Sequence, residues 1–321
     1  MRFLLSALRL PTLLSARALS TTVPPTAVAR SLPFPVYSYA ALGGARNAPN
    51  STLYMFPCLS DNYGFVLHTP PSSILLCDCP DAGRYKAVIE HVMRTEAGPP
   101  LRPGKAKVTL LTTHHHADHT QGNGELLEAY PDAVVFSPDA AIEGTTHPLS
   151  APSLPPTLTS PNHPSLPIAP IDTSGHTLPH VSYHLPSLGL LFAGDALFSL
   201  GCGRLFEGSP AQAHGGLSRL RDLPEATLLL CAHEYTAANV RFCDALGDLR
   251  GRLPAFRQRA AEVERLSGEG RPTIPARLSA EREANPFLRW DCAAVREGAG
   301  AEEGAEDVDV YARIRELKDR F

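Results

Sequence analysis

The chain has 321 residues, 43% of them hydrophobic, and a formal net charge of −4 from 29 basic and 33 acidic side chains. This composition is typical of a globular protein without an overall basic surface, so nucleic acid is not an expected partner. No stretch reaches the ~20 uncharged apolar residues that a membrane-spanning helix needs, and seven scattered cysteines do not suggest a disulfide framework. We therefore expect a monomeric globular protein with no membrane partner.

The N-terminal segment differs in composition from the rest of the chain. No Asp or Glu precedes Asp61, and the first 30 residues carry four arginines among Leu, Ala, Ser and Thr. Such a segment is typical of an organelle transit peptide. We predict that residues 1–30 direct import into the mitochondrial matrix, with a plastid or the cytoplasm as alternatives. Residues 31–51 are rich in Pro, Ala, Ser and Gly, and we interpret them as a linker.

Strand-like and helix-like patterns alternate over residues 52–235. Apolar runs predict strands at 52–57, 64–69, 73–79, 106–113, 132–137, 180–185, 188–194 and 226–232. Helical spacing predicts helices at 84–96, 122–130 and 211–223. Dense prolines over 148–170 argue against a regular helix or a central strand there.

After Tyr235 the pattern is helical, and no convincing strand remains. Helices are predicted at 237–246, 254–266 and 309–321, the last with an apolar stripe of Val310, Ile314, Leu317 and Phe321. An α/β layered domain at 52–235 is therefore expected to precede a helical domain at 236–321.

Residues 112–119 read TTHHHADH, directly after a predicted strand. His114 and His116 are two positions apart, so both side chains can point to the same side, while His115 faces the other way. Asp118 and His119 follow at the turn into a helix. One ion cannot comfortably take four ligands from so short a segment, but two adjacent ions can share them. A metal centre is thus the favoured interpretation.

Three more candidate ligands stand beside apolar strands. His176 lies in a tight turn before one strand, whereas Asp195 and His233 directly follow two others. Each by itself is more often a structural residue, but the histidine cluster makes ligation the better interpretation. Five histidines and two carboxylates suit Zn²⁺, Fe or Mn rather than Ca²⁺ or Mg²⁺. The remaining histidines, His180 among them, are given structural roles.

Six stretches, in order along the chain, resemble glyoxalase II, the hydroxyacylglutathione hydrolase family of the metallo-β-lactamase superfamily. They read PCLSDNYGFVL, TTHHHADHTQGN, TSGHT, FAGDALFSLGCGRLFEG, HEYTAANVRF and NPFLR, and the C-terminal RELK fits as well. The resemblance implies an αββα sandwich followed by a helical domain that covers the active site. It also implies two divalent metal ions, most simply zinc.

The same resemblance assigns roles to individual residues. One ion would be held by His114, His116 and His176, and a second by Asp118, His119 and His233, with Asp195 and a hydroxide between them. The substrate would be a small-molecule glutathione thioester, bound by Arg204, Phe206, Tyr235, Arg315 and Lys318.

Three departures from the family pattern are visible. Phe206 stands where a tyrosine is usual, so one hydroxyl contact is absent. Pro179 precedes His180 where a glycine is usual, and Ala117 occupies a position where a tryptophan is common. None of these departures removes a metal ligand. Together they leave open whether the thiol carrier is glutathione or a modified thiol.

The residue types suit hydrolysis, since paired cations lower the pKa of a shared water from ~15.7 to about 7 and stabilise an oxyanion. The main hypothesis is a thioesterase that releases glutathione and a 2-hydroxy acid such as D-lactate from S-2-hydroxyacylglutathione, in methylglyoxal detoxification. One alternative is a mononuclear-iron persulfide dioxygenase, which should lack the helical domain with its NPF stretch and basic C-terminus. Another alternative is a non-enzymatic paralogue, but all seven predicted ligands are present, which argues against it.

Overall fold

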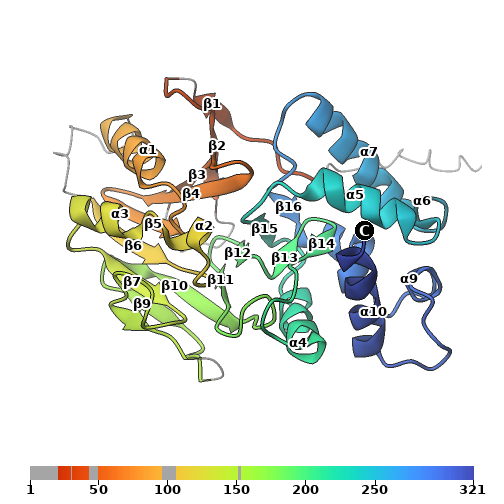
Figure 1. Ribbon diagram of the computed structural model, residues 1–321. Coiled ribbons are helices and arrows are strands. Elements are labelled where there is room, and N and C mark those ends of the chain that lie inside the picture. Colours follow the sequence, from red (N-terminus) through yellow and green to blue (C-terminus); the bar gives the residue numbers. More distant parts are fainter. Residues whose placement is uncertain (1–20, 30, 43–49, 96–105, 151–152) are drawn as a thin grey trace, which may run out of the picture.

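Two β-sheets face each other in the computed structural model, which describes residues 21–29, 31–42, 50–95, 106–150 and 153–321 (Figure 1). The first sheet has the strand order β1(Ala27–Ala29), β2(Val36–Leu42), β3(Ser51–Cys58), β4(Asn62–Thr69), β5(Ser73–Cys77), β6(Lys107–Leu111), β7(Val134–Ser137), β8(His147–Pro148). Its strands pair antiparallel up to β5 and parallel from β5 onward, with Cys58 opposite Asn62 and Cys77 opposite Leu111.

The second sheet carries the other half of the sandwich. Its order is β16(Ala276–Arg277), β15(Leu228–Cys231), β12(Leu190–Gly194), β11(Val181–Leu185), β10(His163–Asp172), β9(Leu158–Ser160). Only β12 and β15 run parallel, with Leu190 opposite Leu228. A short hairpin, β13(Leu197–Phe198) and β14(Gly201–Cys202), follows β12.

Among the described residues, the buried side chains form three clusters that define the layers. Alternate residues of β3 and β4, such as Met55 and Phe65, pack against Tyr183 and Phe192 of the second sheet between the two layers. The other face of the first sheet is covered by α1(Ala82–Thr95) and α3(Asn123–Ala129), and α1 buries one apolar stripe that includes Tyr85. The αββα sandwich that the resemblance implies is therefore confirmed.

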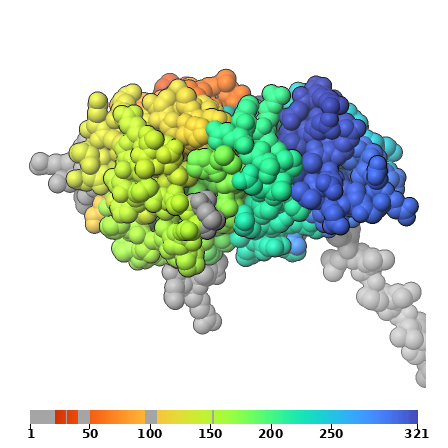
Figure 2. Space-filling view, turned by 60° about the horizontal axis from the view of Figure 1, so that its bottom comes forward, coloured from red at the N-terminus to blue at the C-terminus, as the bar shows by residue number. Residues whose placement is uncertain are grey.

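The outer face of the second sheet packs against the C-terminal helices. These are α4(Pro210–Arg221), α5(Thr236–Ala245), α6(Leu249–Arg252), α7(Pro254–Gly268), α8(Leu278–Ala284), the 3-10 turn η1(Pro286–Leu288), α9(Ala293–Gly298) and α10(Asp307–Asp319). In Figure 2 the blue C-terminal residues lie directly against the segment around residues 200–220, because α10 packs on α4. The predicted helical domain is confirmed, but the expectation of no strand after Tyr235 is wrong, because β16 pairs with β15. No helix among the described residues is both long and apolar enough to cross a membrane.

Three expectations from the sequence need correction. The presumed linker contains strand β2, which extends the first sheet by antiparallel pairing with β3 and buries Val36 and Tyr39. The proline-rich stretch contains β10, whose pairing with β9 is irregular between His163 and Ile168, where two of the prolines lie. Phe321 is 67% exposed, because it lies beyond the end of α10 at Asp319, although its ring is still 5.7 Å from that of Phe242.

The N-terminal prediction is only partly within reach of the structure. Residues 1–20 lie outside the described residues, so the transit peptide stays a prediction for them. Residues 21–29, however, belong to the folded chain, because Thr22 bridges Ala276 and β1 pairs with β2. The folded part therefore begins before residue 52.

Candidate metal centre and active site

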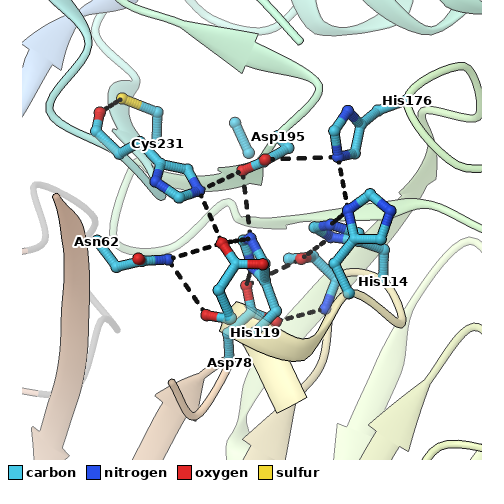
Figure 3. Close-up of polar contacts among 12 residues, drawn as sticks. Asn62, Asp78, His114, His119, His176, Asp195 and Cys231 are labelled. Atoms are coloured by element: carbon cyan, nitrogen blue, oxygen red, sulfur yellow. Dashed lines mark hydrogen bonds and ion pairs between the residues drawn. The ribbon is translucent and has the colours of Figure 1, made fainter. Parts of the chain in front are cut away.

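The seven predicted ligands converge at one rim of the sandwich. His114 to His119 follow β6 and enter the short helix α2(Ala117–Thr120), Asp195 follows β12, and His233 follows β15. His176 comes from the loop between β10 and β11. The carboxyl ends of β6, β12 and β15 meet at the same edge, so residues far apart in the chain face one another (Figure 3).

Three histidines form the first group of donor atoms. His116 Nδ1 lies 3.0 Å from His114 Nε2 and 3.0 Å from His176 Nε2. Their nitrogens point at a common centre, as three ligands of one ion do.

The second group contains Asp118, His119 and His233. Asp118 Oδ2 lies 3.4 Å from the Nε2 atoms of both histidines. The ligand atoms in each group lie within 4.8 Å of one another, so each group fits a single cation.

Asp195 stands between the two groups. Its Oδ1 is 3.5 Å from His119 Nε2 and 3.4 Å from His233 Nε2, whereas its Oδ2 is 3.5 Å from His176 Nε2. The two oxygens of one carboxylate thus face different groups, which is the arrangement a bridging ligand requires.

Glycines allow the backbone around Asp195 to pack closely. A Cβ on Gly203 would lie 1.9 Å from the carbonyl oxygen of Asp195, and Gly194 has φ +53° with Thr113 within 2.8 Å of a Cβ position. Only glycine fits these two positions without displacement of the loop.

Carboxylates that the sequence reasoning missed hold the outer nitrogens of two ligands. Asp78 Oδ2 accepts from His119 Nδ1 at 2.8 Å, and its two oxygens also accept from the amide and hydroxyl of Thr113 at 2.7 and 2.9 Å. Asp61 Oδ1 accepts from His233 Nδ1 at 2.7 Å. Partners of this kind fix the tautomer and orientation of a metal-binding histidine. Their only signal in the sequence is an aspartate at the end of a predicted strand or turn.

Two histidines of the first group are oriented in the same way. His176 Nδ1 donates to the carbonyl oxygen of Arg204 at 2.8 Å, and His114 Nδ1 is 3.0 Å from the hydroxyl of Thr113. Asn62 donates to Asp118 Oδ2 at 3.2 Å. Every ligand nitrogen that faces away from the centre in His114, His119, His176 and His233 therefore has a partner.

His180 has the structural role that the sequence suggested, although it lies beside the centre. Its Nε2 accepts from the backbone amide of Asp195 at 3.2 Å, and its Nδ1 is 2.7 Å from the hydroxyl of Thr173. Burial, together with the nearby charge of His176, lowers the pKa of His180 to about 3, so the ring is neutral. His115 points away, as expected, and pairs with Glu207 at 3.1 Å.

The chemistry of these side chains fits a divalent cation. His119 Nε2 and Asp195 Oδ1 are buried without a hydrogen-bond partner, which is costly unless a cation satisfies them. Burial and the neighbouring histidines lower the pKa of His114 well below its usual value, and neutral imidazole is the form that binds metal. The neighbouring imidazoles of His119 and His233 hold the pKa of Asp118 well below its usual range. The residues therefore form a divalent metal-binding site.

A cavity of about 510 Å³ opens onto this centre. Its wall includes three of the five predicted substrate contacts: Arg204, Phe206 and Tyr235, which are 58%, 61% and 37% exposed. Tyr235 stacks on His233 at 4.7 Å, and the ring of Phe206 lies 5.2 Å from that of His176. These residues lie at the mouth, where a bound molecule would meet them first.

The structure does not bring Arg315 and Lys318 to that wall. Arg315 is 5% exposed, and it donates to the carbonyl oxygens of Cys202 and Gly203 at 2.9 and 3.3 Å. Lys318 donates to the side-chain oxygen of Asn239. Both therefore lie behind the loop that carries Arg204, a position that the spacing of charges along a helix could not reveal.

Comparison with known proteins finds two family models and several relatives that match this chain. The family model described as "Hydroxyacylglutathione hydrolase C-terminus" covers residues 234–321, and that of the "Metallo-beta-lactamase superfamily" covers 101–233. A hydroxyacylglutathione hydrolase of Maricaulis maris is 41% identical over 270 residues, which are 83% of this chain and 97% of that protein. The chain belongs to the hydroxyacylglutathione hydrolase family.

Further relatives agree with this membership. The hydroxyacylglutathione hydrolase of Synechococcus sp. strain JA-3-3Ab is 40% identical over 272 residues, 84% of this chain and 99% of that protein. The crystal structure of the BLEG-1 B3 metallo-beta-lactamase has a TM-score of 0.51 at 17% identity, covering 74% of this chain and 99% of that one. This last likeness supports the fold alone. The resemblance drawn from the sequence is confirmed for family and architecture.

Proposed function

We propose that this member of the hydroxyacylglutathione hydrolase family hydrolyses S-2-hydroxyacylglutathione, with S-D-lactoylglutathione as the preferred example, to glutathione and a 2-hydroxy acid. The observation that carries the proposal is the position of Asp195 between two histidine groups at the base of the cavity. A centre that holds two cations side by side suits hydrolysis of a carbonyl compound with a good leaving group.

The protein's own residues would hold two divalent ions there, one on each group and both on Asp195. Bound ions of this kind supply a hydroxide at neutral pH and stabilise negative charge on the carbonyl oxygen of the substrate. We propose zinc, with iron or manganese as alternatives, because imidazole and carboxylate donors suit all three. Asp78 and Asp61 would keep the Nε2 lone pairs of His119 and His233 directed at the ions.

The mouth of the cavity suits an anionic thioester. The Arg204 guanidinium is more than half exposed; its Nε lies 3.4 Å from Asp319 Oδ1, and its exposed part can attract the carboxylates of glutathione. Phe206 and Tyr235 offer aromatic faces, and the Tyr235 hydroxyl remains protonated, since burial and the nearby Asp61 raise its pKa above the ordinary value. No general acid is needed for the departure of a thiolate.

Activity of the pure protein on defined thioesters tests this proposal. Protein with a measured metal content is offered S-D-lactoylglutathione and a panel of other glutathione thioesters, and release of free thiol is followed. We expect hydrolysis that stops with a chelator and returns with added Zn²⁺. Absence of hydrolysis at full occupancy with zinc, iron and manganese would refute the proposal, and oxygen uptake with glutathione persulfide would favour a dioxygenase instead.

We also propose that the protein acts as a monomer in the mitochondrial matrix. Support for the location comes from the acid-free, arginine-bearing composition of residues 1–30. Imaging of a fusion that carries these residues, against one without residues 1–20, tests the location. A cytoplasmic or plastid signal from the full fusion would contradict it.

A further inference from the structure

The N-terminal residues Thr21–Val23 lie along the edge of the second sheet. The amide of Arg277 donates to the Thr21 carbonyl oxygen at 2.9 Å, the amide of Val23 donates to the Pro275 carbonyl oxygen at 2.9 Å, and Thr22 bridges Ala276. Because β16 is the outermost strand there, this short segment occupies an edge that would otherwise be open.

Part of this chain is not matched by its relatives. The relatives from Maricaulis maris and Synechococcus are matched over 97% and 99% of their own length, but over 83% and 84% of this chain. About a sixth of this chain thus has no counterpart in them, a share similar in size to the segment that precedes β3.

The side chains of Thr21 and Thr22 reach a buried arginine. The Arg259 guanidinium is 0% exposed, and it donates to the hydroxyls of both threonines, at 3.2 Å in the case of Thr21. It also donates to Glu262 at 3.1 Å and to the carbonyl oxygen of Thr273 at 2.8 Å. These acceptors offset much of the cost of burying the charge, although the Arg259 Nε–H has no hydrogen-bond partner among the described residues.

The same guanidinium holds the tip of the hairpin β13–β14. Arg259 donates to the Ser199 hydroxyl at 2.9 Å, and that hydroxyl donates to Glu281 Oε1 at 2.6 Å. Glu281 Oε2 accepts from the amide of Leu200 at 2.8 Å. Leu200 has φ +57°, a conformation that a leucine keeps only when its surroundings impose it.

The hairpin forms part of the active-site wall. Phe198, next to Ser199, lines the cavity, and its ring lies 5.2 Å from Tyr235 and 6.0 Å from His233. Asn285 donates to the carbonyl oxygens of Phe198 and Gly201, which fixes the other side of the hairpin. A continuous set of hydrogen bonds therefore runs from Thr22 through Arg259 and Ser199 to the wall of the cavity.

We propose that Thr21–Val23 is a positioning element of the active site. Its hydroxyls accept from Arg259, which with Glu281 holds Ser199 and Leu200 in place and thereby sets the position of Phe198. It follows that proteolytic removal of an N-terminal leader that leaves the active enzyme intact ends before Thr21.

Thr22→Val in the full chain tests the inference, with Thr26→Val as its matched control. Both variants lose one hydroxyl of the same N-terminal segment, but Thr26 has an exposed side chain and Thr22 a buried one. The first measurement is hydrogen exchange of the Leu200 amide, which does not depend on the substrate. We expect exchange about tenfold faster in Thr22→Val, unchanged exchange in Thr26→Val, and unchanged exchange in β3 to β5 of both.

A second measurement separates positioning from general loosening of the fold. A double-mutant cycle of Thr22→Val with Ser199→Ala should be non-additive in Leu200 exchange and in kcat, because both changes interrupt the same hydrogen-bonded set. Additive effects, or equal acceleration of exchange across the whole chain, would overturn the proposal. Should Thr22→Val not fold, Ser199→Ala alone serves, and unchanged Leu200 exchange in that variant would equally overturn it.

Discussion

Replacement of Asp78 by asparagine should weaken one metal site and spare the other. The buried Asp78 carboxylate accepts from His119 Nδ1 at 2.8 Å and from the amide and hydroxyl of Thr113. Asparagine has the same shape and tolerates the φ of +54° at this position, so the backbone can remain as it is. Its amide nitrogen, however, would stand opposite a donor.

The magnitude follows from the tautomer of His119. With Asp78 present, the ring carries its proton on Nδ1, so unprotonated Nε2 lies beside the oxygens of Asp118 and Asp195 and can join them as a metal ligand. An amide nitrogen opposite Nδ1 favours the other tautomer, whose Nε2 proton blocks ligation. Loss of such a partner typically costs 10–100-fold in metal affinity, or about 1.4–2.7 kcal/mol.

The assay is metal content after dialysis against a zinc buffer, together with kcat. We expect occupancy of the Asp118–His119–His233 group to fall while the His114 group keeps its ion, so zinc drops from two equivalents toward one and kcat falls with it. Asp61→Asn is the matched control, because Asp61 supports His233 from a 39% exposed position where water can replace it. Equal zinc affinity in the Asp78 variant and the wild type would refute the reasoning.

Four further outcomes are expected. Asp195→Ala should abolish hydrolysis, since the carboxylate faces both groups, and wild-type rates in a folded variant would exclude a bridging role. Phe206→Tyr adds a hydroxyl at the cavity mouth and should lower KM about fivefold, the equivalent of about 1 kcal/mol, in a thiol-release assay; a raised KM would contradict this. Gly203→Ala should lower the free energy of unfolding by roughly 1–3 kcal/mol in urea and displace Asp195. At Gly215 an added Cβ would have no atom within 4 Å, so Gly215→Ala should leave the free energy of unfolding unchanged or raise it slightly. Burial lowers the pKa of Lys318 to about 8 from 10.5, so the charged form destabilises the fold most below pH 8. The free energy of unfolding of the wild type should therefore rise from pH 8 to 10.5 relative to that of Lys318→Met. Parallel plots of the two unfolding free energies against pH would contradict this.

Local patterns explain why much of the centre was predictable. His114, His116, Asp118 and His119 lie within six positions, so their convergence needs no knowledge of the fold. Asp195 and His233 each directly follow an apolar strand, and strand ends that share a rim bring such residues together. An α/β layered domain likewise follows from alternating strand and helix patterns, which reflect which face of each element is buried, whereas the αββα order of the layers came from the family resemblance.

Other features depend on long-range packing and were not predictable in the same way. Asp78 and Asp61 resemble ordinary turn residues in the sequence. The pairing of β5 with β6 places Asp78 against His119, and the bridge between Asn62 and His233 places Asp61 against His233. The proline-rich β10 is a strand because an irregular pairing with β9 tolerates residues without an amide hydrogen.

The amino-acid sequence by itself determined the ligand types, their order along the chain and the family, because these depend on side-chain chemistry and spacing. Only the tertiary structure decided that Arg315 and Lys318 lie behind the loop at Gly203 and that Thr22 reaches Arg259, 237 positions away. Which face of a helix meets which loop is a collective result of core packing, and no local pattern encodes it.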